Sequence, residues 1–209
     1  MKKRPVSRFS KPKTKKSGTI ESWHNGADAE IHLYARSLQK AAKSLLETLE
    51  PEQNPGTAWN VCPIIWLYRQ ALELHLKALV GEGSNFLKSK TDPISLYRTH
   101  SLRWLAQIVC QVIKTVGWES DFVCEGISNL AEFSSLVNEI QSLDAVSHFA
   151  SGHDHGSAAQ TFQKISAVQF AMKLDALLEL LDVTADALAA AWDQRAEASG
   201  QNNFGPTIQ

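Results

Sequence analysis

The stretch Tyr68-Arg69-Gln70-Ala71-Leu72-Glu73-Leu74-His75-Leu76-Lys77-Ala78-Leu79-Val80 decides the fold of this chain. Its apolar side chains recur at three- and four-residue steps, the period of a helix that buries most of its circumference. A second segment, His100-Ser101-Leu102-Arg103-Trp104-Leu105, follows after a glycine-containing connection and opens the next apolar-periodic stretch. The first segment therefore predicts a core helix.

Other parts of the sequence repeat the helical period around this segment. We expect helices at about 27–50, 58–80, 99–116, 120–143 and 157–196. No segment alternates with a period of two for long enough to predict a strand. The sequence therefore predicts an all-α fold, an antiparallel bundle of about five helices joined by short connections.

The last of these helices is long for a bundle of this size. About 40 residues would span about 60 Å. We therefore expect either a kink or break near Asp182-Val183-Thr184, or packing of the alanine-rich residues 185–192 on a partner chain.

Composition is that of an ordinary globular domain. The chain has 209 residues, of which 44% are apolar and 21% charged, and it suits one domain with its own core. No apolar run approaches a membrane span, and the N-terminus lacks the apolar core of a secretory signal, so we expect a cytoplasmic protein. The three cysteines include no Cys-x-x-Cys pair, which predicts buried thiols. The expected units are a disordered basic arm at 1–20, the bundle at 21–197 and a flexible tail at 198–209.

Charge is divided unevenly along the chain. The first sixteen residues contain eight bases and no acid, which leaves 13 basic against 22 acidic residues in the rest. The basic residues are Lys2, Lys3, Arg4, Arg8, Lys11, Lys13, Lys15 and Lys16. An arm of this kind gains affinity for RNA or DNA by counterion release. The alternatives are a solubilising tail and an arm that folds onto the acidic body of its own dimer.

The central segments also carry a resemblance. The helix reads Arg-x-Ala-x-Glu-Leu-x-Leu-Lys-Ala-Leu over residues 69–79, glycines follow it, and His100-x-Leu102-x-x-Leu105 opens the next helix; this pattern resembles the HEPN superfamily. Residues 143–154 are similar to a degraded copy of the Leu-Asp…Phe-Arg-Tyr-Pro-x-Asp turn of some members. The resemblance implies a helical bundle, commonly dimeric. It implies either a ribonuclease with an Arg-x4-6-His motif or a non-catalytic binding or scaffolding module.

Arg69 and His75 form an Arg-x5-His pair that fits the spacing of the ribonuclease members. As a catalytic pair, His75 would exchange a proton with the 2′-hydroxyl or the leaving oxygen, while Arg69 holds the phosphate. The resemblance makes Glu73 the candidate that orients them. Six residues place the two side chains about 120° apart around a helix, so they converge only with help from a dimer axis or a neighbouring helix. The alternative is a helix-surface pair without catalysis.

Two further features of this region weigh on the choice. In catalytic relatives the motif usually lies on a later helix, and no arginine occurs between Arg103 and Arg195. Glu73 and Lys77 have the spacing of a solvated salt bridge. His100 is expected to serve as a structural cap or loop anchor. These features favour the non-catalytic interpretation.

A histidine-rich segment precedes the last helix. Its candidates are His148, His153, Asp154 and His155. Imidazole and carboxylate are zinc ligands, but the spacing matches no zinc module, so the alternatives are a loop that contacts a ligand or partner and a plain helix-start turn. We predict no metal and no cofactor. The sequence also lacks a glycine-rich phosphate loop, a Gly-x-Ser-x-Gly elbow and a zinc-protease helix motif.

These observations predict a HEPN-like helical module. We expect a non-catalytic scaffold or nucleic-acid-associated binding protein of a microbial defence, toxin-antitoxin or stress system; the alternative is a metal-independent endoribonuclease. The expected partners are a second copy of the chain, RNA or DNA at the arm, and a protein partner, with no membrane. An exposed Arg69 and His75 in a shared cleft would favour the ribonuclease. Packing of either one against the helix at 27–50 or that at 120–143 would favour the scaffold.

Overall fold

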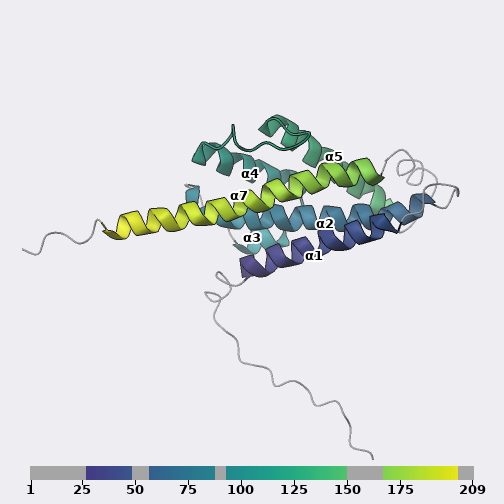
Figure 1. Cartoon of the computed structure of the whole chain (residues 1–209), viewed down its shortest axis with the longest axis horizontal. Coiled ribbons are helices and arrows are strands. Elements are labelled where there is room, and N and C mark those ends of the chain that lie inside the picture. The colour runs from purple at the N-terminus through teal and green to yellow at the C-terminus, as the bar shows by residue number, and fades with distance from the viewer. Residues whose placement is uncertain (1–26, 49–56, 88–92, 150–166, 202–209) are drawn as a thin grey trace, which may run out of the picture.

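The computed structural model describes residues 27–48, 57–87, 93–149 and 167–201 (Figure 1). The helical elements are α1 (Ala27–Glu47), α2 (Thr57–Gly83), the 3-10 helix η2 (Ser84–Phe86), α3 (Pro93–Arg98), α4 (Leu102–Val116), α5 (Leu130–Phe149) and α7 (Ala167–Gln201). Within these ranges the only β pairing is an isolated bridge between Cys124 and Ile127. The predicted all-α bundle is confirmed. The arm predicted at 1–20 lies outside the described residues. The flexible tail predicted at 198–209 is wrong over residues 198–201, which belong to α7, and its remainder lies outside the described residues.

Helix α2 is the centre of the bundle. Helices α1 and α7 pack on one side of it and α4 packs on another, with α5 next to α4 (Figure 1). The core side chains of α2 have no solvent exposure: Ile64, Tyr68, Ala71, Leu72, Leu76, Ala78, Leu79 and Val80. Burial around most of its circumference explains why its apolar residues do not form a single stripe. The central segment therefore has the core role that the sequence predicts.

Helix α4 ends where the sequence predicts and begins within three residues of the predicted start. The Ser101 hydroxyl accepts a hydrogen bond from the Trp104 backbone N–H at 3.3 Å, which caps the start of the helix. Gly117 ends it with φ of 78°, the left-handed conformation that glycine adopts without strain.

The helix predicted from 120 is wrong over its first ten residues. Gly126 has φ of 80°, and α5 begins only after Asn129, whose side chain accepts from the backbone N–H groups of Ala131 and Glu132 at 3.0 Å each. Apolar side chains before that point are still buried, since Phe122 packs edge-on against Phe133 with centroids 5.2 Å apart. Two buried side chains on a largely exposed loop, Phe122 and Ile127, therefore produced part of the apolar pattern that predicts a helix.

Helix α7 runs without a break through residues 182–184, so no kink or break interrupts it there. Ala185 and Leu188 are buried within the same chain, and Trp192 packs on Phe86 with ring centroids 5.7 Å apart. The inner face of residues 185–192 is thus covered by its own chain. The remaining turns extend past the other helices (Figure 1).

The connection between α2 and α4 contains η2 and α3. Phe86 and Leu96 in these short elements are buried and extend the core over one end of α2. The cysteines are partly buried, less than the sequence predicts, and none is in a disulfide. Among the helices described, none is long and apolar enough to cross a membrane.

Candidate functional site

Two polar clusters lie on different sides of α2. Arg69 and Glu73 face the start of α4, where they meet His100. His75 faces α1 and α7, where it meets His32 and Asp182. The structure therefore separates Arg69 from His75, as the angle between their positions on the helix predicts.

Glu73 is the centre of the first cluster. One carboxylate oxygen lies 2.8 Å from Lys77 Nζ and 2.9 Å from His100 Nδ1, and the other lies 3.4 Å from Arg69 Nη1. Arg69 also donates to the backbone carbonyl of His100 at 3.3 Å. Glu73, Lys77 and Arg69 are each at most 6% exposed.

This first cluster joins the two segments that carry the HEPN resemblance. The predicted Glu73–Lys77 pair forms, but it is buried and not solvated, because the α4 end of the bundle covers it. His100 is exposed itself and holds Glu73 through one ring nitrogen, the position expected of a loop anchor. Paired charges of this kind position helices and leave Arg69 committed to protein groups.

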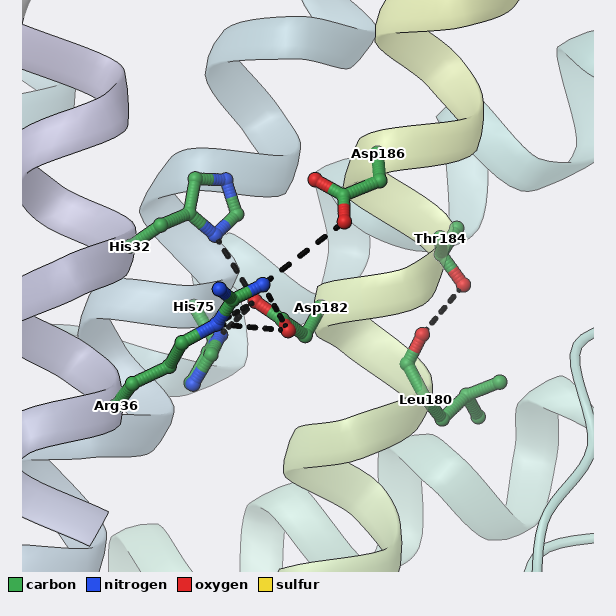
Figure 2. A network of polar contacts seen from close by, with 7 residues as sticks. All are labelled: His32, Arg36, His75, Leu180, Asp182, Thr184 and Asp186. Atoms are coloured by element: carbon green, nitrogen blue, oxygen red, sulfur yellow. Dashed lines mark hydrogen bonds and ion pairs between the residues drawn. The ribbon is translucent and has the colours of Figure 1, made fainter. Parts of the chain in front are cut away.

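The second cluster is centred on Asp182 of α7 (Figure 2). Arg36 Nε donates to its two carboxylate oxygens at 3.1 and 2.9 Å, and His32 Nδ1 lies 3.2 Å from Oδ1. His75 Nδ1 lies 3.7 Å from the same oxygen, too far for a hydrogen bond. Arg36 also reaches Asp186, one turn further along α7, at 3.8 Å. We call His32, Arg36, His75 and Asp182 the Asp182 layer.

His75 is the unusual member of this layer. Its side chain is 1% exposed, and within the described parts of the chain neither ring nitrogen has a hydrogen-bond partner. Burial lowers the pKa of His75 to about 4; the Asp182 charge opposes this shift, while the charges of His32 and Arg36 add to it. The imidazole is therefore neutral at pH 7.

At Asp182, unlike at His75, the neighbouring groups have a larger effect on the pKa than burial has. Burial acts to raise its pKa, but the hydrogen bond from Arg36 and the neighbouring positive charges outweigh burial and lower the pKa below its ordinary value. The same hydrogen bond raises the pKa of Arg36. Asp182 is therefore an ionised carboxylate beside a neutral imidazole.

A second layer repeats the arrangement on the same three helices. Asp175 of α7 accepts hydrogen bonds from Gln39 Nε2 at 2.7 Å and from the Tyr68 hydroxyl at 3.1 Å, and Lys43 Nζ lies at 3.3 Å. We call these four residues the Asp175 layer. Each pairs with a residue of the Asp182 layer seven positions away: Gln39 with His32, Lys43 with Arg36, Tyr68 with His75, and Asp175 with Asp182.

Sequence reasoning found His75 but missed the other three members of its layer. His32 and Arg36 interrupt the apolar stripe of the first helix, and Asp182 interrupts that of the last. Seven residues are close to two helical turns, so the repeated polar positions mark one face of each helix. This shared spacing is the signal from which the layers could have been found.

Other predicted site residues fall outside what the structure describes. The eight basic residues of the arm lie there, as do His153, Asp154 and His155. His148 is in the last turn of α5, where the course of the backbone alone is described. His148 therefore lies in a helix and not in the predicted loop, while the rest of the loop site stays a prediction.

Comparisons with protein families, with curated proteins and with solved structures found no match to this chain.

Three members of the Asp182 layer form the one group of His, Cys, Asp and Glu side chains, among the described residues, that lie close enough together to share a metal ion. Ligand atoms of His32, His75 and Asp182 all lie within 4.8 Å of one another. The set offers two imidazoles and a carboxylate from three different helices. The arrangement can hold a metal ion, or it can hold the helices together through Arg36 and Asp182 alone.

Proposed function

We propose that the chain is a HEPN-like helical module that acts as a non-catalytic scaffold or nucleic-acid-associated binding protein in a microbial defence, toxin-antitoxin or stress system. The observation that carries the proposal is the separation of Arg69 from His75. A catalytic pair must reach one phosphodiester together. Here His75 packs against α1 and α7, while Arg69 is held by Glu73 and the His100 carbonyl.

Burial supports the same conclusion. Arg69 is 6% exposed and His75 is 1% exposed, so neither side chain offers a surface to an RNA strand. A general acid or base has to come within hydrogen-bond reach of the substrate. The alternative, a metal-independent endoribonuclease that uses Arg69, His75 and Glu73, would need both sides of α2 to open.

Nucleic-acid association rests on the charge of the arm. Eight basic residues precede a body that contains 13 basic and 22 acidic residues. The acidic body repels a polyanion, so contact would be confined to the arm. Self-association is proposed from the resemblance and from exposed apolar side chains such as Leu33, Tyr34 and Met172, which are 60 to 62% exposed.

The first test is cleavage of a mixed tRNA and mRNA pool by the full chain, in EDTA and in zinc, beside His75→Leu and Arg69→Ala. In EDTA and in zinc alike, we expect the wild type to show no cleavage that is lost in these variants. Cleavage by the wild type in EDTA that disappears in both folded variants would overturn the proposal and establish the ribonuclease.

The second test is the salt dependence of RNA binding. Fluorescence anisotropy on a single-stranded RNA would compare the full chain with a variant whose eight basic arm residues are glutamine. If the arm neutralises up to eight phosphates, the slope of log affinity against log salt approaches about −6 for the wild type and falls toward zero for the variant. Equal binding by the two proteins would exclude the arm as the contact.

Sedimentation of the full chain over a concentration series tests self-association. We expect a dimer that Leu33→Glu weakens. A monomer at all concentrations would contradict the dimer.

A further inference from the structure

We propose that His32, His75 and Asp182 bind a divalent transition-metal ion of the zinc type, which ties α1, α2 and α7 together. The inference is independent of the proposed nucleic-acid role. RNA binding is tested by changing the arm, whereas metal binding is tested by changing residues of the bundle. Either result can therefore fail without the other.

The imidazole of His75 is unsatisfied within the described part of the chain. His75 is almost fully buried, and within the described residues both of its ring nitrogens are without a hydrogen-bond partner. Leaving a buried polar group unpaired costs about 1–3 kcal/mol. Seven residues earlier on the same face, Tyr68 meets its carboxylate with a hydrogen bond. A metal ion would supply the partner that His75 lacks.

The ligand atoms lie at distances close to those of a metal site. Zinc–nitrogen and zinc–oxygen bonds of about 2.0–2.2 Å place tetrahedral ligand atoms about 3.4 Å apart. Asp182 Oδ1 lies 3.2 Å from His32 Nδ1 and 3.7 Å from His75 Nδ1. No pair in the set exceeds 4.8 Å, so closing the site requires a shift of at most about 1.4 Å.

The donor set also suits such an ion. Two imidazoles and one carboxylate are the protein ligands of many zinc and non-haem iron sites, which keep a further position for water. Because the ligands come from α1, α2 and α7, a bound ion would cross-link α7 to two helices that are distant from it in sequence. Imidazole and carboxylate donors without a thiolate favour zinc, iron, cobalt or nickel over copper(I).

Arg36 is the group that opposes a cation here. Figure 2 shows its guanidinium reaching Asp182 from α1, where it donates to both carboxylate oxygens. The Arg36 side chain is 49% exposed and already approaches the exposed Asp186 at 3.8 Å. A shift of Arg36 toward Asp186 would release Asp182 for the metal. Arg36 is therefore expected to weaken binding, and its removal to strengthen it.

The experiment is a titration of metal-stripped full chain with Zn²⁺ in competition with a chromophoric chelator, repeated with Co²⁺. We expect one equivalent bound and a cobalt spectrum of nitrogen and oxygen ligands without a thiolate charge-transfer band. His75→Leu and Asp182→Asn should each weaken binding by at least about 100-fold, the upper limit for loss of an outer-sphere partner alone. Arg36→Gln should tighten binding by about tenfold, because it removes a nearby positive charge.

Matched controls separate this site from the rest of the chain. Tyr68→Phe changes the equivalent position of the Asp175 layer and should leave zinc affinity unchanged, as should the double variant His153→Ala, His155→Ala. The gain in Arg36→Gln distinguishes the result from simple unfolding. Absence of binding by the wild type, or binding that the loop variant abolishes and His75→Leu preserves, would overturn the proposal.

Discussion

The Asp175 layer and the Asp182 layer use the same three helices and the same spacing, yet they differ at one position of α2. In the Asp175 layer that position is Tyr68, whose hydroxyl donates to the carboxylate at 3.1 Å. In the Asp182 layer it is His75, whose Nδ1 lies 3.7 Å from the carboxylate without a hydrogen bond. In the Asp175 layer, Tyr68 is paired with a protein group. In the Asp182 layer, the ring nitrogens of His75 have no hydrogen-bond partner among the described residues.

The difference indicates what each layer is for. A buried polar group that is fully paired adds specificity to helix packing, whereas one left unpaired lowers stability unless something else binds it. The Glu73 carboxylate on the other side of α2 is likewise paired with protein groups. The Asp182 layer is therefore where a functional ligand is most expected.

The largest expected contrast between the layers is in pH dependence. His75 has a pKa of about 4 in the folded chain against an ordinary 6.5, so the unfolded chain takes up the proton first as the pH falls. Stability is fully present above pH 6.5 and is lost on descent toward pH 4. Between pH 7.5 and 4.5 in EDTA, His75 should account for a loss of about 2.5 kcal/mol.

Urea denaturation of wild type and His75→Leu at the two pH values isolates this effect. The groups that face His75 are His32 and Arg36 from α1 and Asp182 from α7, and the variant keeps all three. The loss on acidification should be smaller in His75→Leu by the stated amount. The same loss in both proteins would place the titration elsewhere.

A smaller contrast is expected from deleting the polar atoms at the matched α2 positions. Tyr68→Phe removes a hydrogen bond to an ionised carboxylate and should cost about 1–2 kcal/mol in the free energy of unfolding. His75→Leu at pH 7.5 in EDTA should cost nothing or stabilise, because it removes an unpaired polar group. Urea denaturation measures both, and a greater cost for His75→Leu would mean that the imidazole has a partner.

The smallest effect is expected at the outer cations of the layers. Arg36 and Lys43 are 49% and 48% exposed, so solvent screens their ion pairs. Arg36→Gln and Lys43→Gln should each cost less than about 1 kcal/mol in EDTA. Thermal denaturation of the two variants beside the wild type measures this cost. A loss of several kcal/mol in Arg36→Gln alone would show that the Arg36–Asp182 ion pair holds the layer together.

Features that depend on residues close together in the chain are predicted from the sequence, whereas features that depend on contacts between distant segments are harder to predict. The bounds of α4 follow from the local capping chemistry of Ser101 and Gly117, and the core role of α2 follows from periodicity. The start of α5 was missed because buried Phe122 and Ile127 imitate a helical face. The signal was present in Asn129 and Glu132, since an Asn with a Glu three residues later marks a helix start.

The site was less accessible to sequence reasoning. The angle between Arg69 and His75 correctly places them on different sides of α2, because it depends on one helix alone. The partners of His75 could not be chosen in the same way, since His32 and Asp182 are 150 residues apart in the chain and meet only through packing.

Zinc-linked stability tests the account most directly. The measurement is the free energy of unfolding of wild type and His75→Leu at pH 7.5, in EDTA and with free zinc at 100 times the dissociation constant of the wild type. Zinc should stabilise the wild type by about 2.7 kcal/mol and the variant by no more than about 0.4 kcal/mol. The wild type should therefore gain on the variant by about 2 kcal/mol between EDTA and zinc. Equal stabilisation of both proteins, or of neither, would contradict the assignment of His75 as a metal ligand.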